Sequence, residues 1–215
     1  MTLKINEIFV SIQGESSLAG FPCVFVRLTG CNLRCSYCDT PYAYEEGEEL
    51  TLNEVKERIR SYRIPLVEIT GGEPLLQAET PKLIHSLLDE GYRVLLETNG
   101  SLDISGVDRR CKRIVDVKLP GSGEEGKNNR DNLKALTPMD ELKFVLSHKE
   151  DYLYAKNTLL SLSPLLLREM VINFSPVMGR LDAAELSSWI LQDRLFVRLN
   201  LQLHKLIWPQ GERGR

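Results

Sequence analysis

The chain has 215 residues, of which 42% are hydrophobic and 27% charged, and its formal net charge is −3. This length and composition indicate one domain, spanning residues 1–215, with enough volume for a hydrophobic core. The negative charge argues against non-specific binding of nucleic acid, and no apolar run is long enough for a membrane span. The first residues lack the layout of a secretory signal, so we expect a cytoplasmic protein whose thiols stay reduced.

The chain reads as strands that alternate with helices. β-Branched and aromatic residues between turn signals predict strands over residues 22–30, 65–74, 92–100, 113–120, 140–147, 168–177 and 194–208. Helical spacing predicts helices over residues 52–62, 80–91, 149–162 and 181–193. The polar, glycine-containing segment 121–132 is predicted to be a long loop. Strands that alternate with helices pair in parallel, and about six such units are too few for a closed eight-stranded barrel.

The predicted strands repeatedly place polar residues on one face. Glu68 and Thr70 alternate with apolar neighbours in one strand, and Glu97 and Asn99 do so in the next. An antiparallel sheet with one face in water would show the same alternation, but its hairpins need no helices. A parallel strand between helices should be apolar on both faces, so a repeated polar face indicates a shared interior that binds a polar ligand. We therefore predict an α/β fold, an incomplete, TIM-like βα barrel of about six strands.

Three cysteines, Cys31, Cys35 and Cys38, follow the first predicted strand. An odd number of thiols in a reducing compartment argues against disulfides, a structural zinc site needs a fourth ligand, and a catalytic zinc site made only of cysteines would be unusual. Iron–sulfur clusters normally have four cysteines, so three suit a cluster only if a substrate or cofactor takes the remaining iron. The isolated Cys23 and Cys111 are predicted to be core residues.

The cysteine spacing, with Tyr37 before the last cysteine, resembles the signature of radical S-adenosylmethionine (radical SAM) enzymes. The segment TGGEP at residues 70–74 resembles the GGEP motif that follows the second strand of these enzymes. The resemblance implies a single radical SAM domain over residues 1–215, with a [4Fe-4S] cluster on the three cysteines and S-adenosyl-L-methionine on its open iron. It implies that the cofactor is contacted by Tyr37, Gly72, Glu97, Asn99, Asp116, Val117 and Lys118.

Within this superfamily, the segments VSIQGES (10–16), CDT (38–40) and QLHK (202–205) resemble the 7-carboxy-7-deazaguanine synthase family. The resemblance implies radical-mediated ring contraction of 6-carboxy-5,6,7,8-tetrahydropterin to 7-carboxy-7-deazaguanine with loss of ammonia. This would be a carbon–nitrogen lyase reaction in the biosynthesis of queuosine and other 7-deazapurines. One position departs from the pattern, because members often have Gly where this chain has Ser16.

The same resemblance implies a substrate site. Gln13 and Glu15 would form hydrogen bonds with the edge of the pterin ring, and the planar guanidinium of Arg27 would pair with its carboxylate. His204, on the polar face of the last predicted strand, would add a donor. The full set of implied substrate contacts is Ile12, Gln13, Gly14, Glu15, Arg27, Thr70 and His204. Which residue of the tail 208–215 closes the pocket is left open.

The resemblance further implies Mg²⁺ with Thr40 as its protein ligand, since one hydroxyl suits a hard cation that is held mainly by substrate oxygens. The expected partners are the small-molecule substrate, a flavodoxin- or ferredoxin-type reductant and a second copy of the chain in a homodimer, with no nucleic acid and no membrane. Two alternatives remain open. One is an activase of glycyl-radical enzymes, which shares the cysteine spacing, and the other is a zinc-binding structural module.

Overall fold

The fold is built on one curved sheet. The structure, a computed structural model, describes residues 1–208 and 213–214, so the rest of the tail lies outside the described residues. The strands are β1 (Thr2–Ile12), β2 (Pro22–Leu28), β3 (Glu48–Thr51), β4 (Leu66–Gly71), β5 (Arg93–Thr98), β6 (Lys112–Asp116), β7 (Glu141–Leu146), β8 (Val171–Pro176) and β9 (Arg198–Leu199). Their order in the sheet is β3-β1-β2-β4-β5-β6-β7-β8-β9.

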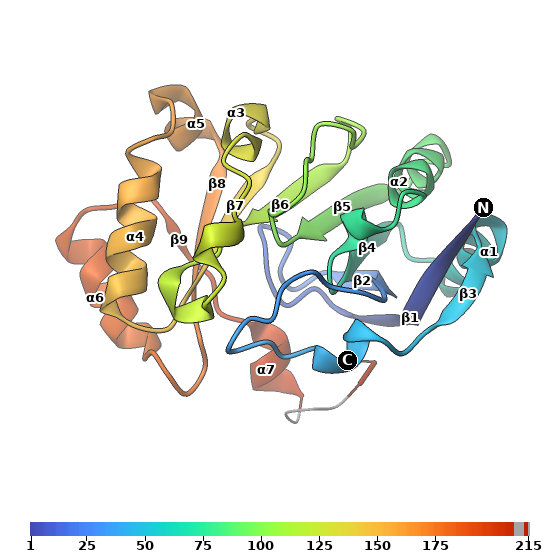
Figure 1. Cartoon of the computed structure of the whole chain (residues 1–215), viewed down its shortest axis with the longest axis horizontal. Helices are drawn as coiled ribbons and strands as arrows, with labels where there is room; N and C mark the ends of the chain where they lie inside the picture. The colour runs from blue at the N-terminus through green and yellow to red at the C-terminus, as the bar shows by residue number, and fades with distance from the viewer. Residues whose placement is uncertain (209–212, 215) are drawn as a thin grey trace.

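The sheet is an open arc rather than a closed barrel (Figure 1). Neighbouring strands from β2 to β9 are parallel, whereas β1 is antiparallel to both β2 and β3. This confirms the predicted incomplete βα barrel, and β2 and β4 to β8 are the strands that the sequence predicted for it. The N-terminal strand β1 was not predicted. It matters for the site because the segment predicted to bind substrate begins at its end.

Helices cover the outer face of the arc. The helices of the described residues are α1 (Leu52–Tyr62), α2 (Thr80–Asp89), α3 (Asn132–Ala135), α4 (Lys149–Leu159), α5 (Pro164–Glu169), α6 (Ala183–Gln192) and α7 (Leu203–Ile207). Helix α7 does not belong to the outer layer, because it packs on the segment after β1. Figure 1 shows α1 and α2 toward one end of the arc and α4 and α6 at the other. None of the helices in the described ranges is long and apolar enough to cross a membrane.

Local signals fix where α1 begins and ends. The hydroxyl of Thr51 accepts a hydrogen bond from the backbone N–H of Glu54 at 3.3 Å, and the Glu54 carboxylate accepts one from the Thr51 N–H at 2.7 Å. This reciprocal capping box satisfies N–H groups that have no partner within the helix. The helix ends at Arg63, whose φ of 56° is left-handed. Such a residue cannot continue a right-handed helix.

Alternate residues of the central strands face two different environments. Residues such as Val67, Ile69 and Leu96 face outward into an apolar cluster with α1 and α2. The opposite face is apolar only toward the amino ends of the strands, where a cluster fills the interior; it consists of Phe9, Cys23, Phe25, Leu66, Leu95 and Ile114. We call this cluster the floor. Beyond it the same face turns polar, with Glu68, Thr70, Asn99, Asp116 and Lys143 all buried. The predicted polar interior is therefore present at the carboxyl ends of the strands.

The prediction of a strand over residues 194–208 was wrong. Only Arg198–Leu199 pair with the sheet, and Leu203–Ile207 form helix α7. The alternation in this segment is genuine, but Leu203, Leu206 and Ile207 also have helical spacing. Beyond β9 the chain bonds to the segment after β1, where the Leu203 N–H donates to the carbonyl of Gly14 at 2.9 Å.

The segment 121–132, predicted as a long loop, is divided into short turns. The 3₁₀ turns η3 (Pro120–Ser122) and η4 (Glu125–Lys127) lie within it, and α3 begins at its end. The Gly121 N–H donates to the carboxylate of Asp151 at 2.7 Å. The segment is therefore fixed to the start of α4.

A buried ion pair joins β6 to the segment before β7. Arg113 and Asp140 have side chains that are 4% and 1% exposed, and Arg113 Nε donates to Asp140 Oδ1 at 2.8 Å. The second carboxylate oxygen of Asp140 accepts the N–H of Thr137 at 2.8 Å. Removing one member of such a pair leaves a buried charge without compensation.

We predict that Asp140→Asn lowers the free energy of unfolding by roughly 3 kcal/mol, because the Arg113 guanidinium loses its counter-charge in a buried site. Denaturant titration would measure the change. The matched control is Asp131→Asn, which breaks an ion pair with Lys134 whose two side chains are both 81% exposed. Screening by water makes that pair weak, so the control should leave the midpoint unchanged. Equal losses in the two variants would contradict the prediction.

Candidate active site

The cysteine loop, residues 30–40, follows β2 at the carboxyl ends of the parallel strands. Cys31, Cys35 and Cys38 are all free thiols of intermediate exposure. The Sγ atom of Cys31 accepts a hydrogen bond from the backbone N–H of Leu33 at 3.4 Å and from the side-chain amide of Asn99 at 3.8 Å. Such N–H donors to sulfur stabilise a thiolate, which is the form that binds iron. The other cysteines, Cys23 and Cys111, are fully buried in apolar clusters, as predicted.

The TGGEP turn holds the cysteine loop at close range. The N–H of Glu73 donates to the carbonyl of Gly30 at 2.7 Å. A Cβ at Gly72 would lie 2.2 Å from that carbonyl oxygen and 2.6 Å from the Cβ of Cys31, so only glycine fits. The glycine was predicted to let the backbone approach a cofactor, and here it also lets the turn approach the loop.

Glu73 was not among the predicted site residues, although it lies in the TGGEP motif. Its carboxylate is fully buried and accepts the N–H of Asn99 at 2.6 Å, the hydroxyl of Thr98 at 2.9 Å and the N–H of Leu75 at 2.9 Å. Glu73 thereby fixes the TGGEP turn to the end of β5, where Asn99 contacts Cys31. The sequence motif does not show that this carboxylate accepts hydrogen bonds from a neighbouring strand, so Glu73 could not be assigned this role in advance.

A second group of predicted cofactor contacts lies at the end of β6. The Lys118 ammonium donates to Asp116 Oδ2 at 2.7 Å. Burial favours the neutral amine, but the negative charges of the Asp116 carboxylate and of the Cys35 sulfur in its thiolate form raise the pKa of Lys118 above its usual range. The other oxygen of Asp116 is buried and has no hydrogen-bond partner within the described ranges. An unpaired buried carboxylate oxygen beside the cysteine loop is a position where a bound ligand would supply the missing donor.

Two other predicted contacts connect the cysteine loop and β6 to β7. The hydroxyl of Tyr37 donates to the carbonyl of Val145 at 3.1 Å, and the N–H of Val117 donates to the carbonyl of Lys143 at 2.9 Å. Both residues therefore have a structural partner on β7. All of the predicted cofactor contacts except Glu97 thus lie beside the cysteine loop. We call the cysteine loop together with these contacts the rim.

Glu97 lies with the predicted substrate residues. Its carboxylate forms an ion pair with Lys143 and accepts the hydroxyl of Thr70 at 3.3 Å. The same ammonium lies 2.9 Å from Oε2 of Glu15, whose Oε1 accepts the amide of Gln202 at 2.6 Å. Lys143 was not among the predicted site residues. A single lysine within a strand of ordinary composition does not by itself indicate a binding site.

The pKa values of two carboxyl groups in this interior are shifted in opposite directions. Burial alone would raise the pKa of Glu15, but the Lys143 ammonium, His204 and the hydrogen bond from Gln202 hold it at about 2. Burial raises the pKa of Glu68 well above its usual range, and the neighbouring Glu97 and Glu15 add to the shift. Glu68 also accepts the side-chain amide of Gln13. Near neutral pH, Glu15 is therefore a carboxylate, whereas the surroundings of Glu68 favour its protonated form.

The segment 12–16 links β1 to this interior. Ile12 is the last residue of β1 and pairs with Pro22, and the Glu15 N–H donates to the side chain of Gln13 at 2.9 Å. A Cβ at Gly14 would lie 2.3 Å from Nδ1 of His204, so His204 packs directly on this glycine. His204 reaches the site from α7 and not from the polar face of a strand, which corrects that prediction.

Arg27 lies near the end of β2, and Thr40 is the last residue of the cysteine loop. Arg27 Nε donates to Glu7 Oε1 at 2.7 Å, and the guanidinium lies over the rings of Phe9 and Tyr42 at 5.6 and 5.9 Å. Its charge is therefore already compensated by Glu7, as burial requires. The Thr40 hydroxyl lies 3.9 Å from the Cys38 sulfur, immediately before the turn η1 (Pro41–Tyr44).

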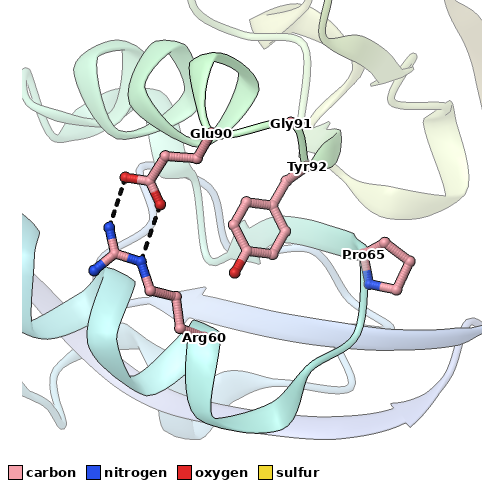
Figure 2. Close-up of a pocket in the computed structure, with 5 residues that line it drawn as sticks. All are labelled: Arg60, Pro65, Glu90, Gly91 and Tyr92. Carbon is pink, nitrogen blue, oxygen red and sulfur yellow. Dashed lines mark hydrogen bonds and ion pairs between the residues drawn. The ribbon is translucent and has the colours of Figure 1, made fainter.

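A surface hollow of about 560 Å³ lies at the opposite ends of the strands. It is lined by Arg60, Pro65, Glu90, Gly91 and Tyr92, which stand before β4 and β5 and at the ends of α1 and α2. Figure 2 shows the paired Arg60 and Glu90 with the Tyr92 ring beside them; the two N···O distances are 2.8 and 3.1 Å. The floor separates this hollow from the cysteine loop, so it is no part of the candidate site.

An open βα arc with three thiols after its first parallel strand defines a class of enzymes. Residues 25–121 match the model of the Radical SAM superfamily. Among its relatives, 7-carboxy-7-deazaguanine synthase of Chlorobaculum tepidum is 47% identical over 99% of this chain and 97% of its own, and that of Koribacter versatilis is 42% identical over 99% and 100%. The chain therefore belongs to the 7-carboxy-7-deazaguanine synthase family.

A solved structure agrees in fold. QueE from Escherichia coli is 24% identical and has a TM-score of 0.72 over 94% of each chain. Membership of the family replaces both alternatives left open by the sequence, the glycyl-radical activase and the zinc-binding module.

Ser16 is the position at which the resemblance in sequence led us to expect glycine. Its φ is 63°, in the left-handed region, and its side chain is fully buried. The hydroxyl accepts the N–H of Leu18 at 3.1 Å, and the Ser16 carbonyl accepts the guanidinium of Arg198. A short polar side chain that bonds locally tolerates this conformation, which explains how serine replaces glycine here.

We predict that Ser16→Gly changes the free energy of unfolding by less than about 1 kcal/mol, because the relief of left-handed strain offsets the lost hydroxyl acceptor. Ser16→Val should lower it by about 1–3 kcal/mol, since a β-branched residue is strained at positive φ. Thermal unfolding of the two variants beside the wild type tests both statements. The explanation fails if valine is tolerated as well as glycine.

Proposed function

We propose that the chain converts 6-carboxy-5,6,7,8-tetrahydropterin to 7-carboxy-7-deazaguanine with loss of ammonia, as a carbon–nitrogen lyase in 7-deazapurine and queuosine biosynthesis. The observation that carries this proposal is one interior bounded by the cysteine loop on one side and by Gln13, Glu15 and Thr70 on the other. The name shared by the relatives supports the same reaction.

The residues at the rim fit the cofactors that a radical SAM enzyme requires. Cys31, Cys35 and Cys38 would hold a [4Fe-4S] cluster, and Asp116, with its unpaired buried oxygen, would contact S-adenosyl-L-methionine together with Gly72 and the other residues of the rim. When bound, these groups supply the one-electron chemistry that starts the reaction. The protein's own part is to place the substrate beside them and to exclude water.

The interior suits the substrate by charge. Glu15 is ionised at neutral pH and can accept hydrogen bonds from the N–H groups of the pterin edge, while Gln13 offers its amide beside it. Within the described residues, only Nε of Arg27 has a hydrogen-bond partner, so its two amino groups remain for the substrate carboxylate. His204 and Gly14 bound the same space from α7 and the segment after β1.

Further partners complete the proposal. The Thr40 hydroxyl at the edge of the cysteine loop suits Mg²⁺ that is bound mainly through substrate oxygens. A flavodoxin- or ferredoxin-type protein would deliver the electron, and a second copy of the chain would complete a homodimer. The single continuous sheet supports one radical SAM domain over the chain.

The direct test is an anaerobic assay of the reconstituted protein with a reductant, S-adenosyl-L-methionine and 6-carboxy-5,6,7,8-tetrahydropterin. We expect 7-carboxy-7-deazaguanine and ammonia in equal amounts, measured by chromatography with mass detection and by an ammonia assay. Cleavage of S-adenosyl-L-methionine without the deazaguanine product would assign the chain to a different radical reaction.

The cluster assignment predicts a contrast between two cysteines. After reconstitution with iron and sulfide, Cys35→Ala should lose the cluster absorbance and most of the iron, from about four atoms per chain in the wild type. Cys111→Ala, which removes a fully buried thiol from the apolar cluster under α1 and α2, should retain both. Iron content and the visible spectrum provide the measurement. Stoichiometric zinc in place of iron, or equal loss in both variants, would overturn the assignment.

A further inference from the structure

Lys143 is a buried cation that the reaction, as described so far, leaves without a role. It lies on β7, its side chain is 6% exposed, and its ammonium contacts Glu15 from the segment after β1 and Glu97 from β5. We propose that Lys143 is a positioning residue for the substrate, holding the carboxylates of Glu15 and Glu97 in fixed directions on two sides of the interior. This inference rests on the proposed function.

The contacts leave neither carboxylate free to turn. Oε2 of Glu15 lies 2.9 Å from the ammonium, and its Oε1 accepts Gln202 at 2.6 Å. Glu97 contacts the ammonium with one oxygen and accepts the Thr70 hydroxyl with the other. A carboxylate oxygen has two acceptor sites, so each group keeps capacity for a ligand while its orientation is set. Preorganised acceptors of this kind lower the cost of binding a substrate.

Electrostatics support the same role. Burial alone would lower the pKa of Lys143, but Glu15, Glu97 and Asp116 raise it well above its usual range, so the ammonium stays charged. One cation thus compensates two carboxylates. Without it, two like charges would face each other in a buried site and would separate or take up protons.

The geometry differs from that of a purely structural ion pair. The buried Arg113 also donates to two backbone carbonyls, those of Ile104 and Ala135, and so ties separate segments of the chain together. Among the described residues, the Lys143 ammonium donates to two side chains and to no backbone carbonyl, and both side chains belong to the polar interior. A structural pair of the first kind stabilises the fold, whereas the Lys143 group sets the positions of ligand-binding groups.

The experiment compares Lys143→Met, Lys143→Arg and a matched control, Lys156→Met. Lys156 lies on α4, away from the interior. Its Nζ atom lies 2.8 Å from Oδ2 of Asp193, with which it forms an ion pair. For each variant, the KM for 6-carboxy-5,6,7,8-tetrahydropterin, kcat and the ratio of 5′-deoxyadenosine to deazaguanine product are measured. Calorimetry with the cluster-free protein measures binding of the pterin alone.

Lys143→Met should raise KM by about tenfold or more and raise the ratio of 5′-deoxyadenosine to product, because a poorly held substrate uncouples cofactor cleavage from its own reaction. Lys143→Arg keeps the charge and should recover part of the KM, and Lys156→Met should match the wild type. If Lys143→Met folds poorly, the double variant Lys143→Met/Glu97→Gln removes the repulsion between the carboxylates. It should regain stability without regaining substrate affinity.

The outcomes separate this inference from the proposed function. An unchanged KM and an unchanged product ratio in a folded Lys143→Met variant would overturn the positioning role. A loss of thermal stability with no change in KM or pterin binding would also overturn it, since it would show a structural role only. If the wild type binds the pterin but makes no deazaguanine product, the proposed function fails; weaker pterin binding by Lys143→Met would then still support the positioning role.

Discussion

The compensation of buried charge inside the open barrel is the interaction on which the rest of the molecule depends. Parallel strands between helices are ordinarily apolar on both faces, and this fold places carboxylates and an ammonium on one of them. Lys143 on β7 makes this possible because it pairs with Glu97 on β5 and with Glu15 after β1, and Glu68 on β4 interacts with both of these carboxyl groups. The strands must be held in one register for these charges to meet, so the interior and the curvature of the sheet support each other.

The cysteine loop shows how an irregular segment becomes fixed by its neighbours. Residues 30–40 contain little regular structure, yet the TGGEP turn holds one end through Gly30. The 3₁₀ turns of residues 120–127 hold the middle, where the backbone N–H of Ser36 donates to the Ser122 carbonyl at 3.0 Å and that of Arg34 donates to Glu124 at 2.6 Å. At the far end Lys205 of α7 lies 2.9 Å from Asp39. The thiols are thus placed by contacts with segments distant in the sequence.

These distant contacts explain what the sequence could and could not predict. Period-two alternation identified β4 to β8 and their polar face, because that pattern is local and repeated. The cysteine and TGGEP spacings identified the rim, because each motif is contiguous. The pairing of Lys143 with Glu15 spans 128 positions, and no local pattern encodes it. Helix α7 formed where a strand was predicted, and its first residue, Leu203, donates its N–H to the carbonyl of Gly14, a contact between distant segments that no local pattern encodes.

The floor determines from which end of the strands a small molecule can reach the interior. Phe9 and Phe25 stack there with ring centroids 5.1 Å apart and planes inclined by 12°, and apolar residues of β4 to β6 complete the seal. The floor therefore closes the interior toward the amino ends of the strands, and a small molecule approaches from their carboxyl ends, beside the cysteine loop. A group held by the cysteine loop then lies nearer to solvent than the substrate residues beneath it, so the order in which the two ligands bind affects whether the second one can enter.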